Sequence, residues 1–385
     1  LSLMLWGVFD ESQAGLQLVQ RVDWIASYGI SYFVGVDGLS MLLIILTTFI
    51  MPISILFSFS THIFAERGRE KLYYLFMMLL EWAMIGVFVA QDLVIFYIFW
   101  EVTLVPMYFL IGIWGGGRRL YSAIKFFLYT LAGSVVMLLG LLAIYFHAHA
   151  ASGVYSFDIT KFHELSVPPD LQFWIFLALF CGFAVKVPMF PFHTWLPDAH
   201  TDAPTAGSVI LAAVMLKMGT YGFLRFSLPI LPEASRYFVP FMALLAIVGI
   251  VYGALVALAQ SDWKRLVAYS SVSHMGMAML GMFALTPVGI TGSIVHQLNH
   301  GISTGALFLL VGMIYDRRHT KLIADMGGLA KSMPLWATML VFASMASIAV
   351  PGLNGIVGEF AIFLGAVELV RDDCRWMILV SRAAT

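Results

Sequence analysis

Long apolar segments separated by short polar ones run along most of the chain. Asp37 can cap a helix that extends to about Ser60. Further apolar spans, suited to a membrane core ~30 Å thick, lie near residues 72–90, 93–113, 119–147, 171–190, 205–228, 237–259, 266–285, 291–315, 334–350 and 352–370. The last two form either one proline-broken crossing or two short segments. The pattern predicts an all-α polytopic membrane protein with about ten crossings.

The N-terminal residues follow this pattern less well. Leu1–Phe9 are apolar but lack a basic flank and an initiating methionine, so we interpret them as the stub of a helix rather than as a signal peptide. Residues 10–35 are mixed and polar, and we expect a loop there.

Lysine and arginine are concentrated in alternate loops. The cation-rich set contains Arg67, Arg69, Lys71, Arg118, Arg119, Lys264, Arg265, Arg317, Arg318, Lys321 and Lys331. The loops between these contain only Lys161 and Arg236. The positive-inside rule therefore places the first set on the cytoplasmic or equivalent negative side. This alternation requires residues 192–204 to face the same side, although they contain no lysine or arginine.

One apolar span is interrupted at an ionisable residue. In Phe183–Pro204, Lys186 is followed by Pro188, Pro191 and Pro197. Proline lacks a backbone donor and clashes with the preceding turn, so the helix that carries Lys186 cannot continue regularly. A broken helix beside an ionisable group is typical of an ion or proton site at membrane depth. The alternative is a lysine that snorkels from a helix end.

The chain contains a weak internal repeat. Residues 124–134 recur in outline as 294–303, and the break at 183–204 recurs at 350–359. The two copies are separated by five crossings, an odd number, so the repeat units are predicted to be inverted, unless the similarity is a chance one between apolar segments. The predicted organisation is residues 1–71 as a helix stub, polar loop and one transmembrane helix, 72–230 as a first five-helix repeat, and 237–385 as a second, inverted repeat whose last helix is missing or aberrant.

Two charged residues lie in the middle of apolar spans. Glu101 and Lys217 are too far from the ends of their spans to snorkel, and burying either ion unpaired costs roughly 3 kcal/mol. A structural ion pair can explain any one such residue. A series of them, one on each of several helices and including Lys186 and Glu359 beside the two breaks, is more typical of a proton path.

Histidines and a further lysine extend this series. His274, His296 and His300 lie between Lys217 and Glu359, and the spacing of His296 and His300 puts both on one helix face. A metal site would need further ligands, and no cysteine or paired carboxylate occurs nearby, so we interpret the histidines as proton-relaying links. Lys125 either snorkels toward the Arg118 end of its span or belongs to an access route from the inside.

The composition supports this interpretation and excludes other classes of protein. Hydrophobic residues make up 61% of the 385 positions and charged residues 11%, with a net charge of -1. No lysine- or arginine-dense run suggests a nucleic-acid partner, and neither a GxGxxG fingerprint nor a phosphate-binding loop is present. Cys181 and Cys374 lie far apart and form no iron–sulfur or CxxC motif. No cofactor or metal is therefore expected on this chain.

Several long motifs resemble the antiporter-like membrane subunits of respiratory complex I. They are residues 99–108, 183–188, 193–200 and 203–209, and residues 271–276 and 358–360 make the chain most similar to the subunit M branch, called chain 4 in mitochondria. The resemblance extends from about Asp37 to Glu368. It implies inverted five-helix repeats with two broken helices, and a proton channel in a translocating NADH-quinone oxidoreductase that is driven by quinone chemistry on other subunits.

The resemblance also implies roles for individual residues. Glu101 looks like the carboxylate paired with Lys186, Lys217 like the central relay, and His274 and His300 like linking groups, whereas His296 matches less firmly. Glu359 stands where related subunits usually carry lysine, which favours this branch over the alternative, a cation/proton antiporter subunit without NADH oxidation.

The resemblance further implies other complex I membrane subunits and the lipid bilayer as partners, and a bacterial inner (plasma) membrane as the location. The family continues beyond the charged residues 371–376, where we expect the last helix to be interrupted. We therefore expect the sequence to be a fragment of a longer protein.

Overall fold

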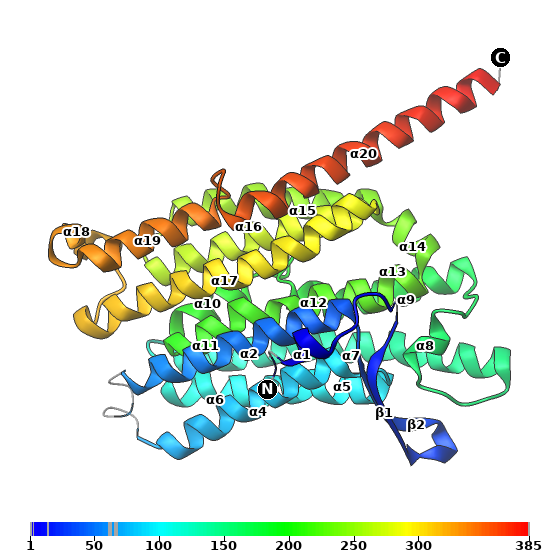
Figure 1. Ribbon diagram of the computed structural model, residues 1–385, viewed down its shortest axis with the longest axis horizontal. Coiled ribbons are helices and arrows are strands. Elements are labelled where there is room, and N and C mark those ends of the chain that lie inside the picture. The colour runs from blue at the N-terminus through cyan, green and yellow to red at the C-terminus, as the bar shows by residue number, and fades with distance from the viewer. Residues whose placement is uncertain (1, 3, 14, 61–63, 65–67, 384–385) are drawn as a thin grey trace.

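Helices lying side by side form most of the molecule, with one β-hairpin near the N-terminus (Figure 1). The computed structural model describes residues 2, 4–13, 15–60, 64 and 68–383, with 372–383 described by their backbone alone. The elements before the first break are α1 (Met4–Val8), β1 (Gln17–Ile25), β2 (Ile30–Val36), α2 (Gly38–Phe59), α4 (Glu70–Val89), α5 (Leu93–Val102), α6 (Leu104–Trp114), α7 (Arg119–Ser152), α8 (Ile159–Phe162) and α9 (Pro169–Lys186).

The remaining elements follow the break after Lys186. They are α10 (Trp195–Asp202), α11 (Thr205–Ile210), α12 (Leu216–Gly222), α13 (Leu228–Ile230), α14 (Pro232–Tyr237), α15 (Val239–Leu258), α16 (Trp263–Phe283), α17 (Pro287–Arg318), α18 (Leu329–Ser332), α19 (Pro334–Ser347) and α20 (Asn354–Ala383). Two π-helical segments, Leu211–Met215 and Phe223–Ser227, join α11, α12 and α13 into one continuous span.

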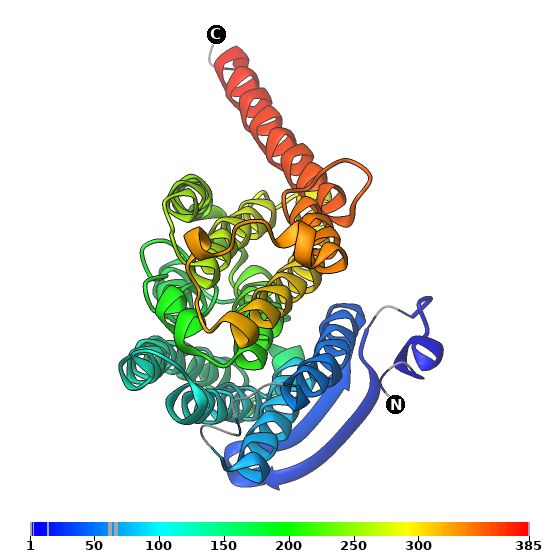
Figure 2. The same cartoon turned by 90° about the vertical axis from the view of Figure 1, so that its left-hand side faces the viewer.

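Nine of the predicted membrane spans are confirmed, whereas the predicted spans near 334–350 and 352–370 are not among them. Across the described ranges, nine helices or joined helices are long and apolar enough to cross a membrane, and α19 is a shorter apolar helix. Asp37 caps α2 as expected, because its side chain accepts a hydrogen bond from the Ser40 amide. The prediction that the last helix is interrupted at residues 371–376 is wrong, since the backbone of α20 stays helical to Ala383. This helix projects from the bundle (Figure 2). Local i to i−4 bonds hold a helix together across charged residues.

The polar N-terminal region forms an element that was not predicted. β1 and β2 pair as an antiparallel hairpin, with Gly29 in the turn at a φ of 71°. The Ser31 amide donates to an Asp92 carboxylate oxygen at 2.9 Å, which attaches the hairpin to the start of α5. The hairpin therefore fixes the chain just before Asp37 and α2.

The described loops separate onto two ends of the bundle as the cation distribution predicts, and Arg67 of that set lies outside the described residues. At the cation-rich end, the Gly116 amide donates to the Asp202 carbonyl at 2.8 Å, and Lys264 Nζ donates to the Ala203 carbonyl at 2.9 Å. Residues 192–204 therefore lie on the expected side. The start of α7 also meets the end of α17 there, because Gly116 and Tyr315 line the same cavity.

Both predicted helix breaks are present. α9 ends at Lys186 and α11 begins only at Thr205, and residues 348–353 separate α19 from α20. The opposite directions of α7 and α17 agree with an inverted repeat. The full division into two five-helix repeats stays a prediction.

Candidate functional site

Lys217 lies at the centre of the bundle in the span that contains the two π-helical segments. Its side chain is fully buried, and its Nζ donates to the Ala212 carbonyl at 2.7 Å. Ala212 lies in the first π-helical segment, where the wider turn leaves a carbonyl available to a side chain. The same Nζ lies 2.6 Å from Nδ1 of His300 on α17. The amine and the imidazole are therefore close enough to share a proton.

Beyond His300, three further predicted residues gather in one cluster. The ring centroids of His300 and His274 lie 5.7 Å apart. His274 Nδ1 lies 3.5 Å from Glu359 Oε1, and His296 Nδ1 lies 4.0 Å from the same oxygen. These side chains come from α16, α17 and α20. The structure thus joins Lys217 to Glu359 through histidines, and it includes His296, for which the resemblance was least firm.

Lys186 and Glu101 do not form the direct ion pair that was predicted. Among the described ion pairs none joins these two residues, and Lys186 Nζ instead lies 3.4 Å from Thr103 Oγ1 and 5.4 Å from the centre of the Trp100 ring. Thr103 follows the end of α5, so its hydroxyl takes the position near the amine. Glu101 still interacts electrostatically with Lys186, and its buried Oε1 has no hydrogen-bond partner within the described part of the chain.

Lys125 forms an ion pair with an aspartate next to the first helix break. Its Nζ lies 2.7 Å from Asp198 Oδ2, and Arg265 Nη2 lies 3.3 Å from Asp198 Oδ1. Asp198 is buried on α10, next to the first break, so one carboxylate links α7, α10 and α16. Of the two interpretations of Lys125, the structure favours the one in which it takes part in a protein site at the cation-rich end.

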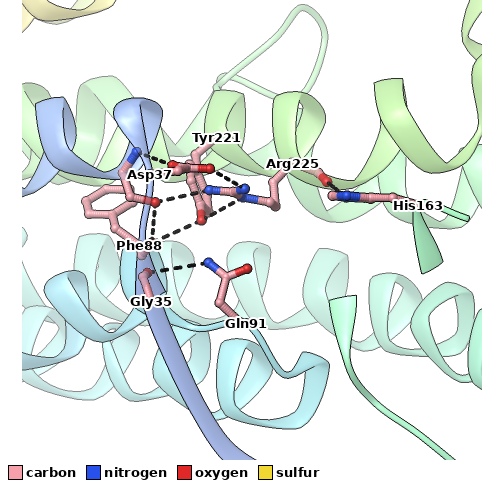
Figure 3. Close-up of polar contacts among 8 residues, drawn as sticks. Gly35, Asp37, Phe88, Gln91, His163, Tyr221 and Arg225 are labelled. Carbon is pink, nitrogen blue, oxygen red and sulfur yellow. Dashed lines mark hydrogen bonds and ion pairs between the residues drawn. The ribbon is translucent and has the colours of Figure 1, made fainter. Parts of the chain in front are cut away.

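Arg225 is a buried residue near the end of its span that the sequence pattern did not single out. Its Nη1 lies 2.6 Å from Asp37 Oδ2, its Nε donates to the Tyr221 hydroxyl at 3.0 Å, and its Nη2 donates to Ser40 Oγ at 3.1 Å (Figure 3). An arginine at the cation-poor end of a span was the signal available in the sequence. Such an arginine runs against the positive-inside rule, which indicates a specific partner.

His200 is a second group that the sequence analysis did not single out from its motif. Its side chain is fully buried and stacked on Phe308, with ring centroids 4.6 Å apart. Neither ring nitrogen has a hydrogen-bond partner in the described residues, and the ring lies within electrostatic range of Lys217 and Lys264. His200 therefore lies between the cation-rich end and the central lysine.

Comparison with protein families divides the chain into two matched regions. Residues 90–383 match the transmembrane family described as NADH:quinone oxidoreductase/Mrp antiporter. Residues 14–87 match the amino terminus of NADH-ubiquinone oxidoreductase chain 4. Together these two regions contain every residue of the candidate site.

Individual relatives extend over nearly the whole chain. NADH-quinone oxidoreductase subunit M of Rhodobacter capsulatus is 49% identical over 382 residues, which cover 96% of this chain and 72% of the relative. NADH-ubiquinone oxidoreductase chain 4 of Marchantia polymorpha is 44% identical over 368 residues, which cover 95% and 72%.

Solved structures give the same result. A chain of respiratory complex I from Thermus thermophilus superposes with a TM-score of 0.85 at 33% identity, covering 96% of this chain and 76% of that one. A chain of the Mrp complex from Dietzia sp. shares the fold, with a TM-score of 0.81 at 24% identity, covering 94% and 39%. The chain therefore belongs to the family of antiporter-like membrane subunits that includes NADH-quinone oxidoreductase subunit M and NADH-ubiquinone oxidoreductase chain 4.

Proposed function

We propose that this chain is a proton-translocating subunit of a redox-driven NADH-quinone oxidoreductase, which moves protons through the membrane while quinone is reduced elsewhere in the complex. One observation carries the proposal. Lys217 Nζ lies 2.6 Å from His300 Nδ1 in the buried centre of the bundle, at a distance where an ammonium can pass a proton to an imidazole.

The proton path follows the buried ionisable groups. Lys186 and Lys217 hold protons in the first half of the chain, and His300 receives one from Lys217 on its Nδ1. His274 passes the proton on to Glu359, whose Oε1 lies 3.5 Å from His274 Nδ1. The Lys217 bond to the Ala212 carbonyl supports the charged amine, so release toward His300 requires that amine to turn or its surroundings to change.

Glu101 serves as a mobile counter-charge for Lys186. When the carboxylate approaches, it stabilises the ammonium, and when it withdraws, the buried lysine loses that stabilisation and releases its proton. In the structure Lys186 Nζ donates to Thr103 Oγ1 at 3.4 Å, and Glu101 lies within electrostatic range of the amine without a direct ion pair among the described contacts. Electrons and quinone would act at other subunits, because the proposed role of this chain needs no redox group of its own.

The same role predicts the partners and the location of the chain. Other membrane subunits of NADH-quinone oxidoreductase and the lipid bilayer are the expected partners, and nucleic acid is not. The outer face of α15 exposes large apolar side chains, including Leu244, Val251, Leu255 and Leu258, which suit a lipid or subunit contact. A bacterial inner membrane is the proposed location.

Proton pumping by the reconstituted complex tests the proposal. Lys217→Ala removes the amine that contacts His300, and we expect the pumping rate to fall about tenfold or more. Lys161→Ala is the matched control, because Lys161 is exposed in a cation-poor loop. Vesicles containing each variant are energised with NADH, and acidification is followed with a fluorescent dye. Full pumping by Lys217→Ala would overturn the proposed function.

A further inference from the structure

Three potential metal ligands from three helices point toward one another beside the second helix break. His274 from α16, His296 from α17 and Glu359 from α20 each offer one ligand atom, and the three atoms lie within 4.8 Å of one another. Both histidines use Nδ1, at 3.5 and 4.0 Å from Glu359 Oε1. The sequence pattern placed only His296 and His300 on one helix face, which is too few ligands for a metal. The structure brings His274 and Glu359 to His296 from neighbouring helices.

The partner of His296 Nε2 determines which nitrogen of that ring carries the hydrogen. His296 Nε2 lies 3.0 Å from the His274 carbonyl oxygen, which can only accept, so Nε2 is the donor. In the neutral ring, Nδ1 then keeps its lone pair. His274 also turns its Nδ1 toward Glu359, while its Nε2 lies 3.3 Å from Ser347 Oγ, a hydroxyl that fits either tautomer.

His296 brings a buried nitrogen without a hydrogen-bond partner among the described residues into this cluster. Its side chain is only 3% exposed, and its Nδ1 has no hydrogen-bond partner in the described part of the chain. The lone pair of His296 Nδ1 and the carboxylate oxygen of Glu359 repel each other unless a cation lies between them. A proton is one such cation, and a divalent metal is another.

We propose that His274, His296 and Glu359 form a binding site for a divalent transition metal of the Zn²⁺ class, and that the bound ion blocks the proton path. Two imidazole nitrogens and one carboxylate oxygen are a donor set that Zn²⁺ accepts, with bonds of ~2.0–2.2 Å and an open fourth position. The carbonyl that holds His296 Nε2 is the kind of outer contact that orients metal-bound histidines.

The surrounding structure provides both space and rigidity. A cavity of about 10 Å³, lined by His274, His296, His300 and Ser347, adjoins the two histidine ligands and suits a single small ion or water. Gly358 lets α20 approach α17 closely, since a Cβ there would lie 2.8 Å from the His296 backbone. This contact holds Glu359 beside His296, so only small side-chain movements are needed to complete the site.

Metal binding and pumping test different parts of this inference. Binding requires only the three side chains, whereas blockage rests on the proposed function, in which His274 and Glu359 carry protons. The first experiment measures Zn²⁺ bound to the purified, metal-stripped complex, as a difference between parent and variants. Glu359→Gln, His296→Ala and His274→Gln alter ligands on three different helices, so one poorly assembled variant does not decide the result. Ser303→Ala, which alters the cavity wall but no ligand, is the matched control.

We expect each ligand variant to lose one bound Zn²⁺ or to bind it at least about tenfold more weakly, and Ser303→Ala to bind like the parent. X-ray absorption of the parent should show two nitrogen ligands and at least one oxygen ligand. Equal Zn²⁺ binding by the parent and all three ligand variants would overturn the site.

The second experiment adds Zn²⁺ to parent and Ser303→Ala complexes in vesicles, and both should lose proton pumping over the range in which the site fills. If the site fills in the parent while pumping continues unchanged, blockage is overturned together with the path through Glu359, but the metal site is not.

Discussion

Lys217 Nζ and His300 Nδ1 lie 2.6 Å apart, although the two residues are 83 positions apart in the sequence. Lys217 belongs to the span that follows the first helix break, and His300 belongs to α17, so their contact connects the two halves of the chain. Both side chains are buried, and the lysine has one further partner, the Ala212 carbonyl. In the proposed path, a proton on Lys217 passes to His300 and so enters the second half of the chain.

Replacing His300 tests whether that route needs a titratable group. His300→Gln keeps a polar side chain near Lys217 but cannot relay a proton at neutral pH, so we expect proton pumping to fall about tenfold or more. Thr304→Ala, one turn further along the buried side of α17, should pump normally. The measurement is NADH-driven acidification of vesicles. Pumping by His300→Gln at the parent rate would show that His300 acts only by hydrogen bonding.

The Asp37–Arg225 pair predicts a large effect on stability. Arg225→Ala leaves Asp37 without the guanidinium 2.6 Å away, and because Arg225 is 10% and Asp37 22% exposed, the loss should lie between that of an exposed and a buried pair, about 2–3 kcal/mol. Arg21→Ala is the control, because Arg21 is 44% exposed in its pair with Asp158 and should cost about 1 kcal/mol or less. Thermal unfolding of the assembled complex in detergent measures both. Similar melting temperatures for the two variants would contradict the predicted difference.

The same pair predicts a loss of stability in acid. Burial alone would raise the pKa of the Asp37 carboxyl, but the hydrogen bond and charge of Arg225 outweigh it, and the pKa lies below its ordinary value of 3.8. A lowered native pKa adds stability above the unfolded value, and this stability is lost as the pH falls through the native pKa. Asp37→Asn should remove this contribution, so its melting temperature should fall less than that of the parent between neutral pH and pH values below about 4. Parallel pH profiles would count against the prediction.

The Lys125–Asp198 contact predicts a role at the cation-rich end. Lys125→Ala removes the amine 2.7 Å from Asp198, and we expect slower pumping if Lys125 supplies protons to the path. Arg265→Ala is the control, because it removes the more distant cation at 3.3 Å and keeps the lysine contact. Initial pumping rates in vesicles compare the two. An equal effect of both variants would indicate that charge around Asp198 matters, rather than Lys125 itself.

Glu101→Gln should slow pumping because Lys186 then loses its counter-charge. The neutral amide keeps the size of the side chain but cannot stabilise a buried ammonium as a carboxylate does. Thr103→Ala removes only the hydroxyl 3.4 Å from Lys186 and should have a smaller effect. NADH-driven pumping measures both, and a larger loss in Thr103→Ala would show that Thr103 is the partner that matters.

Charged residues whose burial in an apolar span costs free energy could be identified from the sequence. Residues whose role depends on contacts with distant parts of the chain could not. Lys217 and Glu101 could be predicted because a charge in the middle of an apolar span requires an internal partner. The absence of a direct Lys186–Glu101 contact could not, because it depends on where Thr103 lies after α5 ends.

Arg225 and the hairpin also depend on contacts with distant parts of the chain, which the sequence does not reveal. Arg225 lies near the end of its span, where capping and burial look alike in a sequence, and its partner Asp37 is far away along the chain. The hairpin at Gln17–Val36 has only weak alternation, and it is held in place by Asp92 on another element.

Glu359 is the proposed end of the proton path in the second half of the chain. Its Oε1 lies 3.5 Å from His274 Nδ1 and 4.0 Å from His296 Nδ1. Glu359→Gln keeps the size of the side chain but cannot bind and release a proton, so pumping through this subunit should be abolished or strongly reduced. Glu359→Lys keeps a titratable group at this position and should keep part of the activity, although it removes the carboxylate ligand of the proposed metal site. Pumping by reconstituted complexes separates these outcomes, and full activity in Glu359→Gln would show that protons leave by another residue.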